Sequence, residues 1–284
     1  MGQSSSPIAP ITMAKIPAKV SARLAAGLKR FQPILDSARA RDVSEADTVT
    51  IVKDILAEVL GYDKYSEVTS EHLIRATYCD LAVKLSGKLA WLIEVKAAGM
   101  DLKDQHIKQA VDYAANQGCE WVGLTNGVRW CVYRVTFAKP ISHALVADVD
   151  LSLLNPRKDA DLDILWMVSK EGWLKSHLDD YAAQQEALSH YTLGALLLSD
   201  PVLSVMRREL RRISPEARIE QDGIARVLHG LVIKRDVLEG ERASAASKLV
   251  ARAAKRTLRV KSDAPEEQIH QAELASPPAA ALMS

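Results

Sequence analysis

A strongly apolar run, LAWLIEV, extends from Leu89 to Val95. Continuous apolar runs of this length are typical of a central strand that is covered on both faces. The residues before it alternate between polar and apolar from Tyr78 to Leu85, and Ser86-Gly87-Lys88 supplies a short hairpin connection. The sequence therefore predicts a hairpin whose second strand lies in the middle of a sheet.

Helices and further strands surround this hairpin. Ser44 followed by Glu45 is typical of a helix N-cap with an acid in the first turn. Apolar residues with helical spacing follow as far as Gly61, so a helix is expected here. A short strand is expected over residues 65–70. Beyond the hairpin we expect a helix over residues 103–116 and two strands joined by Asn126-Gly127, a strong hairpin signal. The predicted order is α-β-β-β-α-β-β, and the fold class is therefore α/β with a mixed sheet flanked by helices.

The pattern of apolar residues changes after this region, because helical spacing predominates beyond Pro156. We expect four segments: an N-terminal tail and lead-in (1–39), the α/β domain (40–155), a small all-α C-terminal region with a basic face (156–261) and a disordered tail (262–284).

Composition excludes several classes of protein. The chain holds 37 Lys and Arg against 36 Asp and Glu, so nucleic-acid binding would require a local basic patch. Three cysteines without a CxxC pair argue against a disulfide framework or a zinc ribbon. No apolar run approaches the ~20 residues that span a bilayer, and no secretory signal is visible. We expect a soluble, cytoplasmic protein with no membrane contact.

Three charged residues are predicted to converge at one end of the central hairpin. Glu94 and Lys96 point to the same face of their strand because side chains alternate, and the hairpin brings Asp80 toward the same point. Carboxylates are preferred ligands of Mg²⁺, which activates water and offsets charge on a phosphoryl oxygen. Lys96 would position or deprotonate the attacking water. This residue set predicts hydrolysis of a phosphodiester.

The spacing Asp80-x13-Glu94-Val95-Lys96 resembles the signature of the PD-(D/E)xK nuclease superfamily. Gln109 and Tyr113 resemble its QxxxY motif, and the segments SEADT…LGYD and LTNGVRWCVYR resemble the N-terminal nuclease domain of type I restriction enzyme R subunits. The resemblance implies a restriction-endonuclease-like sheet and a Mg²⁺- or Mn²⁺-dependent DNA endonuclease. It also implies a metal site formed by Asp80, Glu94, the Val95 carbonyl and Glu45, with Gln109 and Tyr113 beside the DNA.

The sequence departs from this family in two places. Cys79 stands where the family has proline, a position that shapes backbone rather than chemistry. No GxxxxGK[ST] motif is present, so we expect a nuclease module without an ATPase motor. Whether it works with a separate motor or specificity subunit, or as a homo-oligomer, is left open by the sequence.

Simpler interpretations stand beside the nuclease hypothesis. A Glu-x-Lys pair is commonly a solvated strand edge, Tyr113 fits a core aromatic residue, and Glu45 fits a first-turn acid that interacts with the helix dipole. The alternatives to a DNA endonuclease are a non-catalytic DNA-binding or assembly module with the nuclease fold, and an RNA-directed nuclease.

Two basic clusters mark the C-terminal half. Residues 242–261 contain no acid, and a row at four-three-four spacing shares one helix face: Lys248, Arg252, Lys255 and Arg259. The second cluster is Arg207, Arg208, Arg211 and Arg212. Each cluster fits either sequence-independent phosphate contact or a solvated face of a helical bundle.

Overall fold

The computed structural model describes residues 15–74 and 77–262 of the 284-residue chain. Contacts divide the chain into two compact units, Met1–Gln185 and Glu186–Ser284, which we call the sheet unit and the helical unit. No described helix combines the length and hydropathy that crossing a bilayer requires.

The sheet unit is built on a mixed sheet, which in the described residues has six strands in the order of the sequence. Its strands are β1 (Val68–Ile74), β2 (Thr77–Leu85), β3 (Lys88–Val95), β4 (Trp121–Thr125), β5 (Arg129–Thr136) and β6 (Ser142–Asp150). Strands β3 and β4 are parallel, and the other neighbouring pairs are antiparallel. The predicted α/β class, mixed sheet and helical C-terminal region are confirmed.

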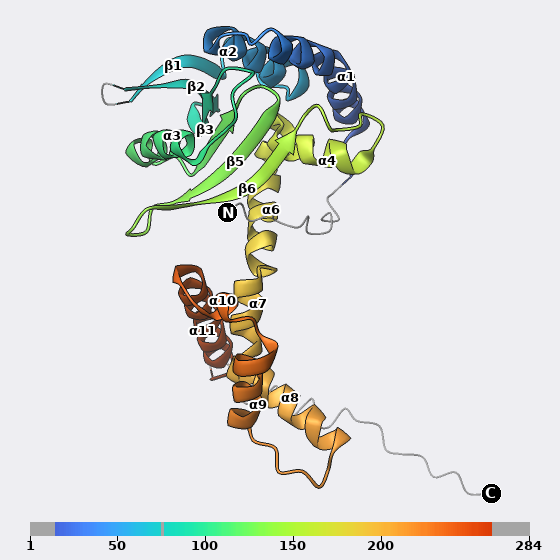
Figure 1. The fold of residues 1–284 in the computed structure, drawn as a ribbon, viewed down its shortest axis with the longest axis vertical. Coiled ribbons are helices and arrows are strands. Elements are labelled where there is room, and N and C mark those ends of the chain that lie inside the picture. The colour runs from blue at the N-terminus through green and yellow to red at the C-terminus, as the bar shows by residue number, and fades with distance from the viewer. Residues whose placement is uncertain (1–14, 75–76, 263–284) are drawn as a thin grey trace, which may run out of the picture. The chain divides into compact units, whose positions relative to one another are not determined.

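Helices cover both faces of this sheet. On one side lie α1 (Ala18–Ala40), α2 (Glu45–Asp54), the π-helical turn η1 (Ile55–Val59) and α4 (Asp159–Val168), and on the other lies α3 (Asp104–Gln117). Figure 1 shows α1 and α2 along one side of the sheet and α3 along the other. Strand β3 is therefore buried on both faces, with Trp91, Ile93 and Val95 in one core cluster and Leu92 in the other. This burial confirms the interpretation of the LAWLIEV run.

The predicted turns and helix ends recur at the expected residues. Ser44 caps α2, Gly61 follows η1 with a φ of 84°, and Gly118 ends α3 with a φ of 65°. These glycines occupy the left-handed region, which only glycine enters without steric cost.

Two elements of the sheet unit differ from the predictions. Helix α1 occupies most of the expected lead-in over residues 1–39, and its residues Leu24, Leu28, Phe31 and Leu35 are buried in the core. These residues recur at helical spacing, which the surrounding Ala and Ser residues obscure. Strand β6 was not predicted, because an edge strand with one exposed half lacks a clear apolar alternation.

The compact units also divide at 185/186, not at the predicted 155/156. The helices that follow residue 155 pack into the sheet unit: Trp173 of α5 (Lys170–Leu174) stacks on Trp91, with ring centroids 5.4 Å apart. The Arg23 guanidinium of α1 binds both carboxylate oxygens of Glu171 at 2.6 and 2.7 Å. Helix α6 (His177–Ala187) ends at this boundary. The predicted segment 156–261 is helical as expected, but its first part completes the core of the α/β unit.

The helical unit contains α7 (His190–Leu197), α8 (Asp200–Ile213), α9 (Gln221–Val227), η2 (Leu228–Val232), α10 (Arg235–Leu238) and α11 (Glu241–Ser262). Its small core includes Leu203, Ile224 and Leu228. Helix α11 packs on α7 through small residues, of which Ala243 and Ala246 are buried. The expected tail over 262–284 lies, apart from Ser262, outside the described residues.

Candidate nuclease site

The candidate site lies where β3 ends and α2 begins. Leu81 of β2 pairs with Ile93 of β3, so Asp80 and Glu94 follow one step further along the same antiparallel ladder. The Asp80 carboxylate accepts a hydrogen bond from the Val95 amide at 2.7 Å. The Lys96 amide donates to the Thr125 carbonyl at 2.8 Å, which ties the end of β3 to β4. The backbone around the three predicted residues is therefore held by hydrogen bonds.

Glu94 is the most deeply buried carboxylate of this site, with an exposed fraction of 1%. Its Oε1 accepts a hydrogen bond from the Lys96 ammonium at 2.7 Å, whereas its buried Oε2 has no hydrogen-bond partner among the described residues. Burial raises the pKa of Glu94 to about 7, and the negative charges of Asp80 and Glu45 also raise it. The hydrogen bond and charge of Lys96 lower this pKa but do not outweigh burial. An unpartnered buried carboxylate oxygen is costly, so this residue is unlike an ordinary solvated strand end.

The Lys96 ammonium joins two carboxylates that belong to different elements. It lies 2.7 Å from Glu94 and 3.5 Å from Glu45, and its side chain is 11% exposed. Burial lowers the pKa of Lys96, but the hydrogen bond and charge of Glu94, together with Glu45 and Asp80, outweigh burial and raise it. The ammonium is therefore charged and balances the carboxylates around it.

Among the side chains that the structure describes, no three His, Cys, Asp or Glu residues gather as a preformed metal-binding group. Glu94 and Glu45 are instead connected through Lys96. The chemistry of the donors still suits a hard divalent cation, because such cations take oxygen ligands and the Glu94 Oε2 lacks any partner.

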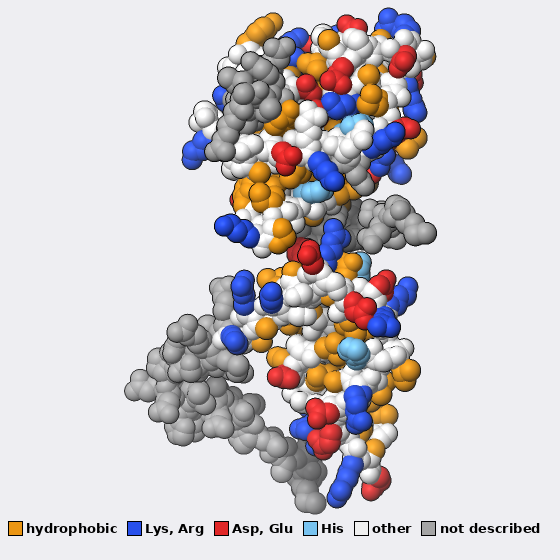
Figure 2. Space-filling view, turned by 60° about the vertical axis from the view of Figure 1, so that its left-hand side comes forward, with side chains coloured by type: hydrophobic (Ala, Val, Ile, Leu, Met, Phe, Trp, Pro, Cys, Tyr) orange, Lys and Arg blue, Asp and Glu red, His pale blue; other side chains and the backbone are white. Residues whose placement is uncertain are grey.

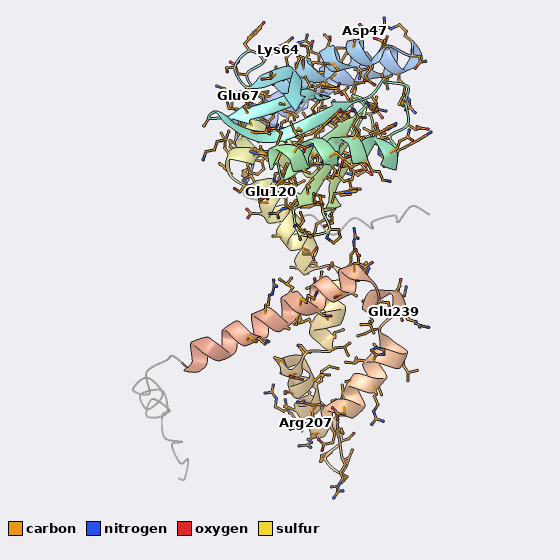
Figure 3. The ribbon with its side chains drawn as sticks, turned by 90° about the vertical axis from the view of Figure 1, so that its left-hand side faces the viewer. Asp47, Lys64, Glu67, Glu120, Arg207 and Glu239 are labelled. Atoms are coloured by element: carbon orange, nitrogen blue, oxygen red, sulfur yellow. The ribbon has the colours of Figure 1, made fainter. Side chains whose placement is uncertain are left out.

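Glu45 reaches the site because of the cap that begins its helix. The Ser44 hydroxyl accepts a hydrogen bond from the Asp47 amide at 3.2 Å and donates to the Asp47 carboxylate at 2.8 Å. Asp47 is labelled in Figure 3 at this end of α2. The Glu45 side chain is 46% exposed, so both its predicted metal-site role and its role as a first-turn acid are compatible with this position.

Replacing Ser44 with alanine is expected to lower the free energy of unfolding by about 1 kcal/mol, because the first turn of α2 loses its cap. The Ser44→Gly variant should lose only a few tenths of a kcal/mol, since glycine is tolerated at this position. Urea unfolding of wild type and the two variants measures the losses, and an unchanged free energy of unfolding in Ser44→Ala would show that the hydroxyl does not stabilise the helix.

Gln109 and Tyr113 lie on α3, one turn apart. The Gln109 side-chain amide donates to the Tyr113 hydroxyl at 2.9 Å. The Tyr113 ring is buried against the sheet, and Gln109 is exposed. The pair is thus formed as the QxxxY spacing implies, with the ring in the core, as the simpler interpretation of Tyr113 also expected.

Two further residues belong to the surroundings of the site. Cys79, which stands at the family's proline position, is fully buried, and burial followed by the charge of Glu94 raises its pKa to about 12. His106, which the sequence analysis missed, begins the row that Gln109 and Tyr113 continue at i+3 and i+7. Burial and the charge of Lys96 lower the pKa of His106, and the charge of Glu45 opposes them. The row spacing on α3 was the signal that could have revealed His106.

Comparison with known proteins supports the resemblance inferred from the motifs. Residues 51–147 match the family described as the type I restriction enzyme R protein N terminus. The matched segment includes Asp80, Glu94, Lys96, Gln109 and Tyr113, and excludes Glu45 and α1. Neither the curated proteins nor the solved structures yielded a match.

Proposed function

We propose that the sheet unit is a Mg²⁺-dependent DNA endonuclease of the type I restriction kind. The observation that carries this proposal is the buried Glu94 carboxylate, which lies close to Asp80 and Lys96. Its Oε2 has no hydrogen-bond partner in the part of the chain that the structure describes. A purely structural strand end has no reason to retain a desolvated carboxylate with one unsatisfied oxygen. A segment that matches a restriction enzyme family supplies the reaction class.

The residues of the site fit a divalent cation. The Glu94 Oε2, the Asp80 carboxylate and the Val95 carbonyl would hold it, and Glu45 would complete the set from α2. When bound, Mg²⁺ or Mn²⁺ supplies an acidified water and offsets negative charge on the phosphoryl oxygen. Binding would also stabilise the charged form of Glu94, whose pKa burial raises to about 7.

Lys96 would be the residue that acts on the attacking water. Its ammonium is held by Glu94 on the face of β3 that carries the carboxylates. In hydrolysis the water oxygen forms a bond to phosphorus and the bond from phosphorus to the leaving oxygen breaks. The water gives up a proton to solvent, and the leaving oxygen takes up a proton from solvent to become a hydroxyl. Lys96 would orient the water and offset the negative charge that develops during attack.

DNA is the proposed substrate because the matched family is a restriction enzyme component. Gln109 and Tyr113 would lie beside the DNA backbone, with the exposed Gln109 amide as the donor to phosphate. A motor or specificity subunit is the proposed partner, because the matched family is a component of a type I restriction enzyme.

Cleavage of a supercoiled plasmid tests this function. Wild-type protein should nick the plasmid with Mg²⁺ or Mn²⁺ and should be inactive with a chelator. The Asp80→Asn variant retains an oxygen that can accept the Val95 hydrogen bond but loses the charge, so half-maximal activity should require at least about tenfold more metal. Glu120→Gln is the matched control, because Glu120 precedes β4 at the opposite end of the parallel β3–β4 pair (Figure 3).

The same assay separates the alternatives. Cleavage that is unaffected by Asp80→Asn would contradict the proposed site. Faster cleavage of a matched RNA would favour the RNA-directed nuclease. Absence of cleavage together with absence of metal binding by calorimetry would favour a non-catalytic module.

A further inference from the structure

Helix α11 carries basic residues on the side opposite its packing face. Ala243 and Ala246 are buried against the rest of the helical unit, whereas Lys248, Arg252 and Lys255 are exposed. At 100° per residue, the three basic positions centre on the side of the helix facing away from the two alanines. Figure 3 shows α11 extending beyond the other helices of its unit, so this side is not covered by them.

These three residues, which we call the α11 basic row, form no ion pair with a described carboxylate. In the second basic cluster of this unit, by contrast, each arginine lies within ion-pair distance of a glutamate. Arg208 and Arg212 of α8 bind Glu209 at 3.1 and 2.8 Å, and Arg207 and Arg211 lie 3.4 and 3.5 Å from Glu220. The structure thus distinguishes two clusters that look alike in sequence. Of these two clusters, the α11 basic row is the one whose charges have no described carboxylate partner.

We propose that the α11 basic row binds the phosphate backbone of a DNA duplex without regard to sequence. Charge complementarity carries the proposal, because residues 242–261 contain seven Lys and Arg and no acid. From Lys248 to Lys255 the helix rises about 10 Å, close to the axial length of three phosphates of one strand. Figure 2 shows a group of basic side chains on the left-hand side of the helical unit. The row offers no amide or hydroxyl pattern for base edges, so its contribution is affinity rather than recognition.

The choice of DNA as partner rests on the proposed function, but binding does not require cleavage. The test is therefore fluorescence anisotropy of the full chain with a random duplex of about 30 base pairs, in chelator, over a series of salt concentrations. The triple variant Lys248→Gln, Arg252→Gln and Lys255→Gln should bind at least about tenfold more weakly, and its slope of log K against log salt should be shallower by about 2 to 3.

Two matched variants make the test specific. Arg207→Gln, Arg208→Gln and Arg212→Gln removes the same charge from the paired cluster and should leave the salt slope unchanged. The charge-retaining variant Lys248→Arg, Arg252→Lys and Lys255→Arg should bind like wild type. Glutamine is a good helix former, so circular dichroism should show α11 retained in every variant.

Several outcomes would overturn the proposal. An equal decrease in the slope of log K against log salt in both glutamine triple variants would attribute binding to overall charge. Failure of the wild-type protein to bind the duplex would show that the α11 basic row is not a DNA-binding surface. Association with phosphatidylserine vesicles but not with DNA would assign the α11 basic row to a membrane surface. Because binding is measured in chelator and cleavage with metal, failure of the nuclease site and failure of the α11 basic row give different results.

Discussion

Replacing Lys96 with methionine is expected to slow metal-dependent DNA cleavage by about 10²- to 10⁴-fold, the contribution of a well-placed group that handles a proton or developing charge. The same change should tighten binding of the divalent cation. The Lys96 ammonium lies between Glu94 and Glu45, so it would compete with a cation for their oxygens and repel its charge. Methionine fills similar space without the charge.

Calorimetry of Mn²⁺ binding measures the second effect. At about pH 8.5, where Glu94 is ionised in the wild type, the Lys96→Met protein should bind the cation about 3- to 10-fold more tightly, since removal of a nearby charge is worth about 1 kcal/mol. Lys64→Met is the control, because Lys64 pairs with Asp54 rather than with the site (Figure 3). Weaker metal binding by Lys96→Met than by wild type would mean that the lysine organises the carboxylates instead of competing for them.

The Glu94→Gln variant is expected to be more stable than wild type at alkaline pH when no divalent cation is present. Burial raises the pKa of Glu94 in the folded protein to about 7, above its ordinary value of 4.5. The folded state therefore holds a proton that the unfolded state releases, so the wild type loses stability as the pH rises from about 4.5 to about 7. Above pH 7 the full shift corresponds to about 3 kcal/mol, which glutamine avoids because it never ionises.

Thermal unfolding between about pH 5 and pH 8.5 checks this expectation. The advantage of Glu94→Gln should be greatest at the alkaline end and should shrink toward pH 5. Added Mn²⁺ should stabilise the wild type at pH 8.5 and leave the variant largely unchanged, because the variant lacks the charged ligand. The exposed Glu120→Gln variant should follow the wild-type curve. A constant difference between Glu94→Gln and wild type across this range would contradict the raised pKa.

Local patterns predicted much of the sheet unit. The LAWLIEV run identified β3, Asn126-Gly127 identified the β4–β5 hairpin, and the alternation of side chains predicted that Glu94 and Lys96 share a face. Each of these features depends on residues close together in the chain. The packing of α4, α5 and α6 into the sheet unit was not predicted, because it depends on contacts between residues far apart in the chain, such as Trp91 with Trp173 and Arg23 with Glu171.

The residues of the candidate site were predictable from the sequence, whereas the contacts between them were predictable only in part. Spacing and resemblance identified Asp80, Glu94 and Lys96, and the structure brings Glu94 and Lys96 into direct contact. The connection of Lys96 to Glu45 joins residues 51 positions apart, and no local pattern encodes it. The orphaned Glu94 oxygen likewise results from three-dimensional packing rather than from any motif.

The stacking of Trp173 on Trp91 decides where this protein can be divided. The match to a known family spans residues 51–147, yet Trp173, α4 and Glu171 lie beyond it and Arg23 lies before it. A fragment trimmed to the matched segment would leave the middle of β3 facing water. In recombination or engineering, the portable unit is therefore the whole sheet unit, and a graft has to carry helices that lie outside the segment matched by sequence similarity.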